Sequence, residues 1–124
     1  MPRRREPDAF AVAVGRRIQA LRQEAGLTME KLAYESDLGS KGHLSNLERG
    51  LVRPTIETLR VLAERLGCLP LDLLTFPEQD ARQTLVELSR KLSRGALRKL
   101  VSEAGAKPPR ARRGRSTARR AAKK

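Results

Sequence analysis

Residues 26–50 read GLTMEKLAYESDLGSKGHLSNLERG, and this stretch decides the fold. Thr28 and Ser40 are favourable helix N-caps, and each precedes a short segment with helical spacing of apolar residues. The turn between them is rich in Ser, Asp and Gly, with Leu38 as its single apolar anchor. Gly50 is a typical residue to end the second segment. The stretch therefore predicts two short helices, the second over Lys41 to Arg49, joined by a tight turn.

The inward faces of these two segments are short. We expect them to be formed by Leu32, Ala33, Leu44 and Leu47. On the opposite side of the second segment lie Lys41, Gly42, Ser45 and Asn46. A short helix, a glycine-bearing turn and a second helix make a helix-turn-helix, whose second helix can lie in the major groove of DNA.

Helical patterns continue on both sides of this stretch. Upstream, a helix is expected from the cap Asp8 to Gly26; its apolar face is Phe10, Val14, Ile18, Leu21 and Ala25. Downstream, a helix is expected from the cap Thr55 to Gly67; its buried stripe is Ile56, Leu59, Leu62, Ala63 and Leu66. Pro70 starts a fifth short helix, Leu71 to Leu74. No alternating strand pattern occurs, so we predict an all-α domain of five helices.

Composition narrows the function classes. The chain has 124 residues, with no Trp, one Tyr and two Phe, which favours a small helical core of aliphatic residues. No apolar run is long enough to cross a membrane, and the N-terminus lacks the apolar segment of a signal peptide. Cys68 and His43, each present once, give neither a disulfide nor a metal site nor a catalytic pair. We therefore expect a cytoplasmic, non-enzymatic protein without a cofactor.

The net charge of +13 is unevenly distributed. Residues 105–124 contain nine basic residues and no acid, which leaves 18 basic against 14 acidic residues in the first 104. We expect a flexible basic arm at 1–8, a folded domain at 9–76, and a disordered basic tail at 106–124. Between the domain and the tail, we expect a dimerisation or partner segment at 77–105 that contains two short helices, because Ser93-Arg94-Gly95 interrupts the helical pattern. The basic residues of the two arms are Arg3, Arg4, Arg5, Arg110, Arg112, Arg113, Arg115, Arg119 and Arg120.

Unpaired basic arms favour nucleic acid as a partner. The N-terminal arm can enter a minor groove. The tail contains Arg-Gly-Arg at 113–115, as in an AT-hook, but without flanking prolines, and it is also similar to linker-histone tails. A nonspecific electrostatic role is the simpler interpretation.

Three motifs together resemble the Cro and lambda-repressor type of helix-turn-helix regulator. They are GLTMEKLA at 26–33, LSNLERG at 44–50 and PTIETL at 54–59, supported by GRRIQALR at 15–22. The resemblance covers about residues 9–76 and implies five helices, with the third reading DNA and most members dimeric. This sequence departs from the family pattern at two places. The turn has one extra residue near Gly39, so that either Gly39 or Ser40 can cap the third helix. At the start of the second helix, Met29 stands where many members have Gln.

Residue types and resemblance agree on the binding roles. For bases we predict Lys41, Gly42, Ser45 and Asn46, because Asn pairs with adenine and Lys with guanine edges. For phosphates we predict Thr28, Ser40, His43, Arg49 and Arg53. Three of these have a plainer alternative: Ser40 as a cap only, Arg49 as a solvated or paired charge, and His43 as an exposed side chain. For Tyr34, a phosphate contact through its hydroxyl and a plain exposed side chain are equal alternatives. The resemblance also implies a structural ion pair between Arg22 and Glu48, and a small buried side chain at Cys68.

The leading hypothesis is a sequence-specific regulator, in effect a dimeric bacterial repressor that reads a palindromic operator on double-stranded DNA. One alternative is a nucleoid-type architectural protein, in which the arms do most of the binding. Another is an antitoxin that autoregulates its operon and meets a protein partner through residues 78–104. RNA binding is weaker, because no aromatic platform is present to stack bases.

Overall fold

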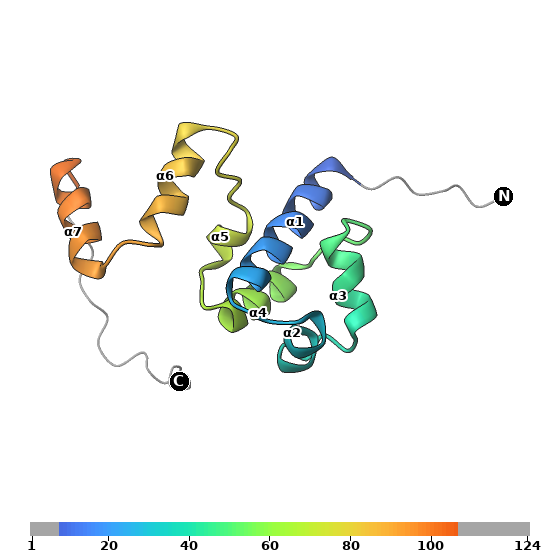
Figure 1. Cartoon of the computed structure of the whole chain (residues 1–124). Coiled ribbons are helices and arrows are strands. Elements are labelled where there is room, and N and C mark those ends of the chain that lie inside the picture. Colours follow the sequence, from blue (N-terminus) through green and yellow to red (C-terminus); the bar gives the residue numbers. More distant parts are fainter. Residues whose placement is uncertain (1–7, 107–124) are drawn as a thin grey trace. The chain divides into compact units, whose positions relative to one another are not determined.

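The computed structural model describes residues 8–106, so the expected arm contacts at Arg3–Arg5 and in the tail lie outside the described residues. One compact unit ends at Arg90 and a second begins at Lys91 (Figure 1). The described residues of the first unit contain α1 (Ala9–Glu24), α2 (Met29–Glu35), α3 (Lys41–Glu48), α4 (Ile56–Leu66), α5 (Pro70–Leu73) and α6 (Ala81–Ser89). The second unit contains α7 (Arg94–Glu103). The all-α prediction and its helix order are confirmed, and the first unit extends past the boundary expected at Phe76-Pro77.

The predicted caps begin the helices where the sequence places them. The side chains of Asp8, Thr28, Ser40 and Thr55 each accept a hydrogen bond from the backbone N–H three residues later, at 3.0–3.1 Å. Ser40, and not Gly39, is therefore the cap of α3. The longer turn is accommodated by two left-handed residues, Asp37 at φ 55° and Gly39 at φ 90°, the second of which suits a residue without Cβ.

The core is aliphatic and is shared by five helices. Its fully buried side chains include Ile18, Leu32, Leu44, Leu47, Leu62 and Leu73. Leu38 in the turn, Leu59, Leu66 and Cys68 pack against this cluster, partly buried. Each of the helices from α1 to α5 supplies at least one of the fully buried side chains, which holds α2 and α3 on a common support.

Three residues expected on inward faces lie elsewhere. Ile56 is 87% exposed and Phe10 is 59% exposed, and Ala25 is also exposed. All three stand at helix ends, where the apolar stripe extends beyond the core; at the start of α4 the Cβ of Ile56 also points back past the end of the helix. Phe10 still has a ring partner, since it meets Phe76 edge-on with centroids 5.7 Å apart.

Gly15 allows α1 and α3 to cross at close range. A Cβ at this position would lie 2.4 Å from the carbonyl oxygen of Leu47 and 2.5 Å from that of Glu48. A second close approach lies at the end of α3, where Gly50 at φ 76° would place a Cβ 2.6 Å from Val12. The backbone of the third helix is thus seated directly on the first.

The described residues of the second unit contain one capped helix. Ser93 caps α7, and no residue of that helix is buried. In the part of the chain from 8 to 106, no helix combines the length and the apolar character needed to cross a bilayer.

Gly15→Ala tests the close crossing. The added methyl would push the carbonyls of α3 away from α1, so we expect a loss of about 1–3 kcal/mol of folding free energy, as for other overpacked cores. Chemical denaturation followed by circular dichroism measures it. Gly42→Ala is the matched control, because its Cβ would meet only Ser40 Oγ at 3.7 Å and alanine favours a helix. Equal destabilisation by both changes would contradict this account of the crossing.

Candidate nucleic-acid interface

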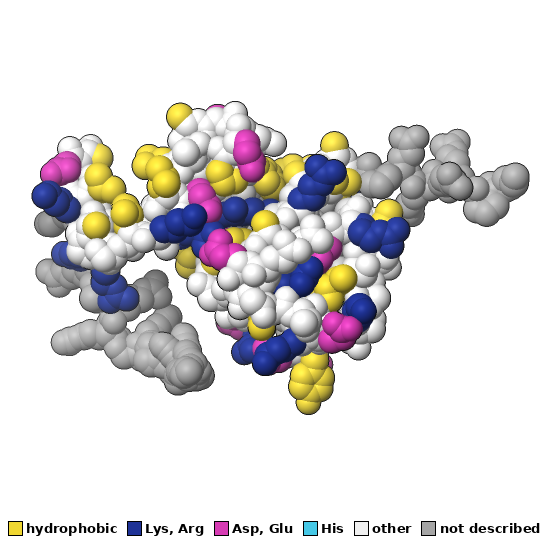
Figure 2. Space-filling model, viewed as in Figure 1, with side chains coloured by type: hydrophobic (Ala, Val, Ile, Leu, Met, Phe, Trp, Pro, Cys, Tyr) yellow, Lys and Arg dark blue, Asp and Glu magenta, His cyan; other side chains and the backbone are white. Residues whose placement is uncertain are grey.

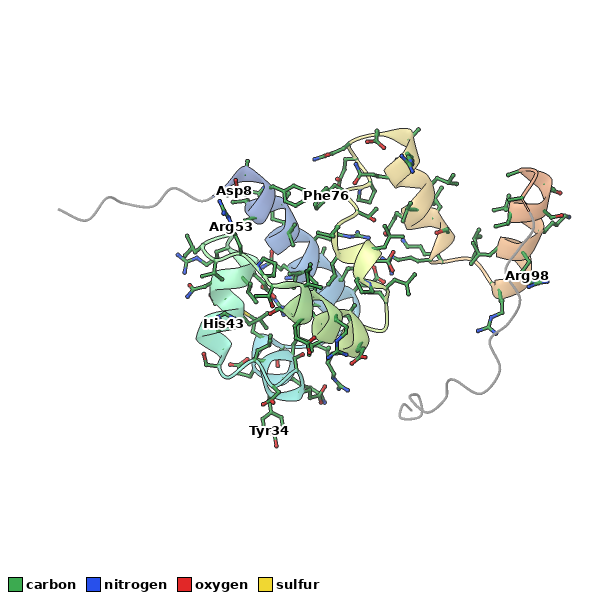
Figure 3. The ribbon with its side chains drawn as sticks, turned by 180° about the vertical axis from the view of Figure 1, so that it is seen from behind. Asp8, Tyr34, His43, Arg53, Phe76 and Arg98 are labelled. Atoms are coloured by element: carbon green, nitrogen blue, oxygen red, sulfur yellow. The ribbon has the colours of Figure 1, made fainter. Side chains whose placement is uncertain are left out.

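The outer face of α3 is polar, whereas its inner face is sealed into the core. Leu44 and Leu47 are 0% and 1% exposed, so the rotation of the helix about its axis is fixed. On the other side Lys41, Gly42 and His43 are exposed, and Ser45 and Asn46 are half-buried. Figure 3 labels His43 on α3. The four predicted base-contacting residues thus lie on one helix, whose inward face is packed in the core and cannot contact a ligand.

A buried ion pair locks α3 to α1. Arg22 Nε donates to Glu48 Oε2 at 2.7 Å, and its terminal nitrogen donates to Oε1 at 3.2 Å. Arg22 also donates to the backbone carbonyl of Leu27 at 2.8 Å, which ties in the connection before α2. Both residues are more than nine-tenths buried. The expected structural pair is present, and it fixes the end of α3 opposite to its cap.

Apart from His43, the predicted phosphate-contacting residues lie at helix ends or beside them: Thr28 caps α2, Ser40 and Arg49 stand at the two ends of α3, and Arg53 follows α3. The hydroxyls of Thr28 and Ser40 accept cap hydrogen bonds, so the hydroxyl protons stay available for an anion. The first N–H groups of a helix have no partner within the helix and favour negative charge. Arg49 and Arg53 are exposed and form no ion pair with another residue of the described segment; Figure 3 shows Arg53 on the connection after α3.

Lys41 has a partner that spacing did not reveal. Its ammonium group lies 3.0 Å from Glu30 Oε2, across the turn, and both side chains are more than half exposed. The hydrogen bond from Lys41 and the charge of its ammonium hold the pKa of Glu30 below its usual value. In the sequence, Glu30 is only a carboxylate near the start of a short helix. No periodic pattern links positions 30 and 41, so only the folded turn brings them together.

Two other α2 residues bear on the interface. Met29 is partly buried against the core, which gives it a packing role in place of the hydrogen bond that Gln would make. Tyr34 is 88% exposed and points outward from α2 (Figure 3).

A second ion-pair cluster, also missed by the sequence, fastens α6 to α1. Arg17 donates to Glu87 at 2.5 Å and to the backbone carbonyl of Asp72 at 2.7 Å. Arg90 contacts both Glu87 and Glu24 within 3.0 Å. Hydrogen bonds from Arg90 and Arg17 lower the pKa of Glu87 to about 2. No residue of α6 is buried, and this polar cluster links α6 to α1 and to the backbone of Asp72.

Charge on the first unit is mixed. Figure 2 shows Lys and Arg side chains dispersed over the visible face, with Asp and Glu between them. This agrees with the near balance of the first 104 residues. Within residues 8–106 no group of three or more His, Cys, Asp or Glu is placed to hold a metal ion. Burial raises the pKa of the Cys68 thiol to about 11, so it carries no thiolate chemistry at neutral pH.

Comparison with known proteins agrees with this geometry. The family model described as "Helix-turn-helix" matches residues 18–74. The chain is 44% identical over 62 residues to the uncharacterized HTH-type transcriptional regulator y4dJ of Sinorhizobium fredii, covering 50% of this chain and 79% of that protein. The chain belongs to the helix-turn-helix family of Cro and lambda-repressor type. It is thus a transcriptional regulator with a helix-turn-helix DNA-binding domain.

Two further relatives support the assignment. The HTH-type transcriptional regulator DdrOP3 of Deinococcus deserti is 39% identical over 77 residues, which cover 62% of this chain and 59% of DdrOP3. Among solved structures, the restriction-modification controller protein C.AhdI of Aeromonas hydrophila superposes with a TM-score of 0.51 and 32% identity. That match covers 53% of this chain and 98% of C.AhdI.

Glu48→Ala tests the ion pair that holds α3 to α1. It leaves the Arg22 guanidinium buried with only the Leu27 carbonyl, so we expect a loss of about 3–5 kcal/mol in folding free energy. Thermal and urea unfolding measure the loss. Glu64→Ala on α4 removes an exposed carboxylate of an ion pair and should change stability little. A loss from Glu48→Ala no greater than the control's would show that the pair does not hold α3.

Proposed function

We propose that this protein is a dimeric repressor that reads a palindromic operator on double-stranded DNA with α3. The observation that carries the proposal is the fixed rotation of α3. Leu44 and Leu47 turn inward, and Lys41, Ser45 and Asn46 turn outward on a helix that can lie in a major groove. The proteins named transcriptional regulators among its relatives support the same reading. Such a protein would act in the cytoplasm, at the bacterial nucleoid.

The division of labour at the interface follows from side-chain chemistry. Asn46 offers both a donor and an acceptor, as adenine requires in the major groove, and Lys41 offers donors to guanine. Ser45 adds a hydroxyl, and Gly42 lets the helix approach closely. Thr28, Ser40, His43, Arg49 and Arg53 are assigned to phosphates, where contacts set register without reading sequence. The arms add sequence-independent affinity.

Dimerisation is assigned to the segment 77–105. The exposed leucines of α6 support it: Leu85 is 61% and Leu88 is 55% exposed, while ion pairs link this helix to α1. In Figures 1 and 3, α6 and α3 lie on opposite sides of α1. A second copy on α6 would therefore leave α3 open to DNA. Two half-sites about one helical turn apart are expected for such a dimer.

Selection from a random DNA pool tests this function directly. The full chain should enrich an inverted repeat, and Asn46→Ala should lose preference at one position in each half-site while retaining the others. Sedimentation of the complex should give two chains per site. Equal affinity for selected and random duplexes at moderate salt would replace the repressor by an architectural protein.

Deletion of residues 107–124 tests whether the tail contributes to DNA affinity or to sequence specificity. The segment contains nine basic residues. Its removal should weaken binding to every duplex alike and reduce the slope of log K against log salt by about 0.9 for each phosphate that the tail neutralises. Filter binding at several salt concentrations measures this. A changed preferred sequence after the deletion would show that the tail reads bases.

A further inference from the structure

The ion pair between Glu30 and Lys41 joins the first turns of α2 and α3. Glu30 lies two residues after the cap Thr28, and Lys41 directly follows the cap Ser40. The pair thus stands between the two helix N-termini that the proposed function directs at phosphates. Its 3.0 Å contact is the single ion pair between α2 and α3 within the described segment.

Stability does not explain this pair. Its side chains are 66% and 53% exposed, and exposed ion pairs of this kind contribute little to folding. The two helices are already held by Leu32, Leu44 and Leu47 in the core and by the Arg22–Glu48 pair. A carboxylate at this position also opposes any approaching polyanion.

The ion pair with Glu30 restricts where the ammonium group of Lys41 can bind. A free lysine is a point charge on a flexible stem, and on a DNA surface it finds the nearest phosphate. Bound to Glu30, the ammonium group keeps two further N–H donors, which suffice for the N7 and O6 acceptors of guanine. The same carboxylate makes the site less attractive to DNA that offers phosphates but no matching base.

We propose that Glu30 is a specificity-determining residue, which holds Lys41 at the base edges and withholds it from the phosphate backbone. This inference rests on the proposed function, since it requires α3 to read DNA. It deepens that function by assigning selectivity to a residue of α2, outside the recognition helix. The glutamate lowers affinity for all DNA and lowers it least where Lys41 meets its base.

Glu30→Gln is the direct test, because it retains the shape of the side chain and removes its charge. The full-length variant should bind random duplex DNA several-fold more tightly, with a salt slope steeper by about 0.9 for each lysine that gains a phosphate. In pool selection, discrimination at one position per half-site should fall about fivefold or more. That position should be the one at which Lys41→Gln also loses its preference.

The control is Glu64→Gln. Glu64 is 67% exposed and paired with Arg60, which keeps Glu57 as a second partner. This change removes the same charge from α4 and should leave base preferences and random-duplex affinity unaltered. Circular dichroism melting of all three variants checks that each is folded.

The outcomes are distinguishable. If Glu30→Gln keeps every base preference while Lys41→Gln loses one, or if Glu30→Gln and Glu64→Gln behave alike, Glu30 does not determine specificity. If the wild-type protein selects no sequence at all, the proposed function fails first and this inference fails with it. A reduced preference shared by Glu30→Gln and Lys41→Gln, absent from Glu64→Gln, supports the proposal.

Discussion

The seating of α3 on α1 is the constraint on which the rest of the structure depends. Gly15 lets the two backbones approach more closely than a methyl group between them would allow. The Arg22–Glu48 pair fixes the end of α3, and the Ser40 cap fixes its start. Replacing a buried ion pair by apolar residues is often neutral in stability. The contribution of the Arg22–Glu48 pair is geometric, because the pair helps to set which side chains of the two-turn helix α3 face outward.

Local rules predicted most of the fold. Caps, glycine stops and apolar spacing located five core helices, because each of these signals depends on residues within one turn of the chain. They failed at Ile56 and Phe10, since the length of an apolar stripe does not reveal where the core ends. The candidate site divides in the same way. The outward face of α3 follows from the inward leucines, and the Arg22–Glu48 pair followed from family resemblance. The Glu30–Lys41 and Arg17–Glu87 pairs join positions distant in sequence, and only folding reveals them.

The attachment of α6 has a different character from that of the other helices. It depends on Arg17, Arg90, Glu24 and Glu87, while its leucines remain exposed. A helix held by polar contacts can keep an apolar face for another chain, whereas a helix held by its leucines cannot. The depressed pKa of Glu87 makes this attachment pH-dependent. A carboxyl whose pKa falls on folding stabilises the fold at pH values above its pKa in the unfolded chain, which is near 4.5. This stabilisation is lost as the pH falls towards about 2, the pKa of Glu87 in the folded protein.

The proposed function separates the residues that attract DNA from those that read its sequence. The tail carries nine basic residues, and a polyanion attracts them regardless of sequence. The interface around α3 carries fewer cations, and its leading lysine is partly neutralised by Glu30. Additional cations on α3 would raise affinity for every duplex and so reduce the ratio between specific and random binding. Under the proposed function, a regulator that must dissociate from random DNA therefore gains from having few cations on the face that reads bases and most of its positive charge elsewhere.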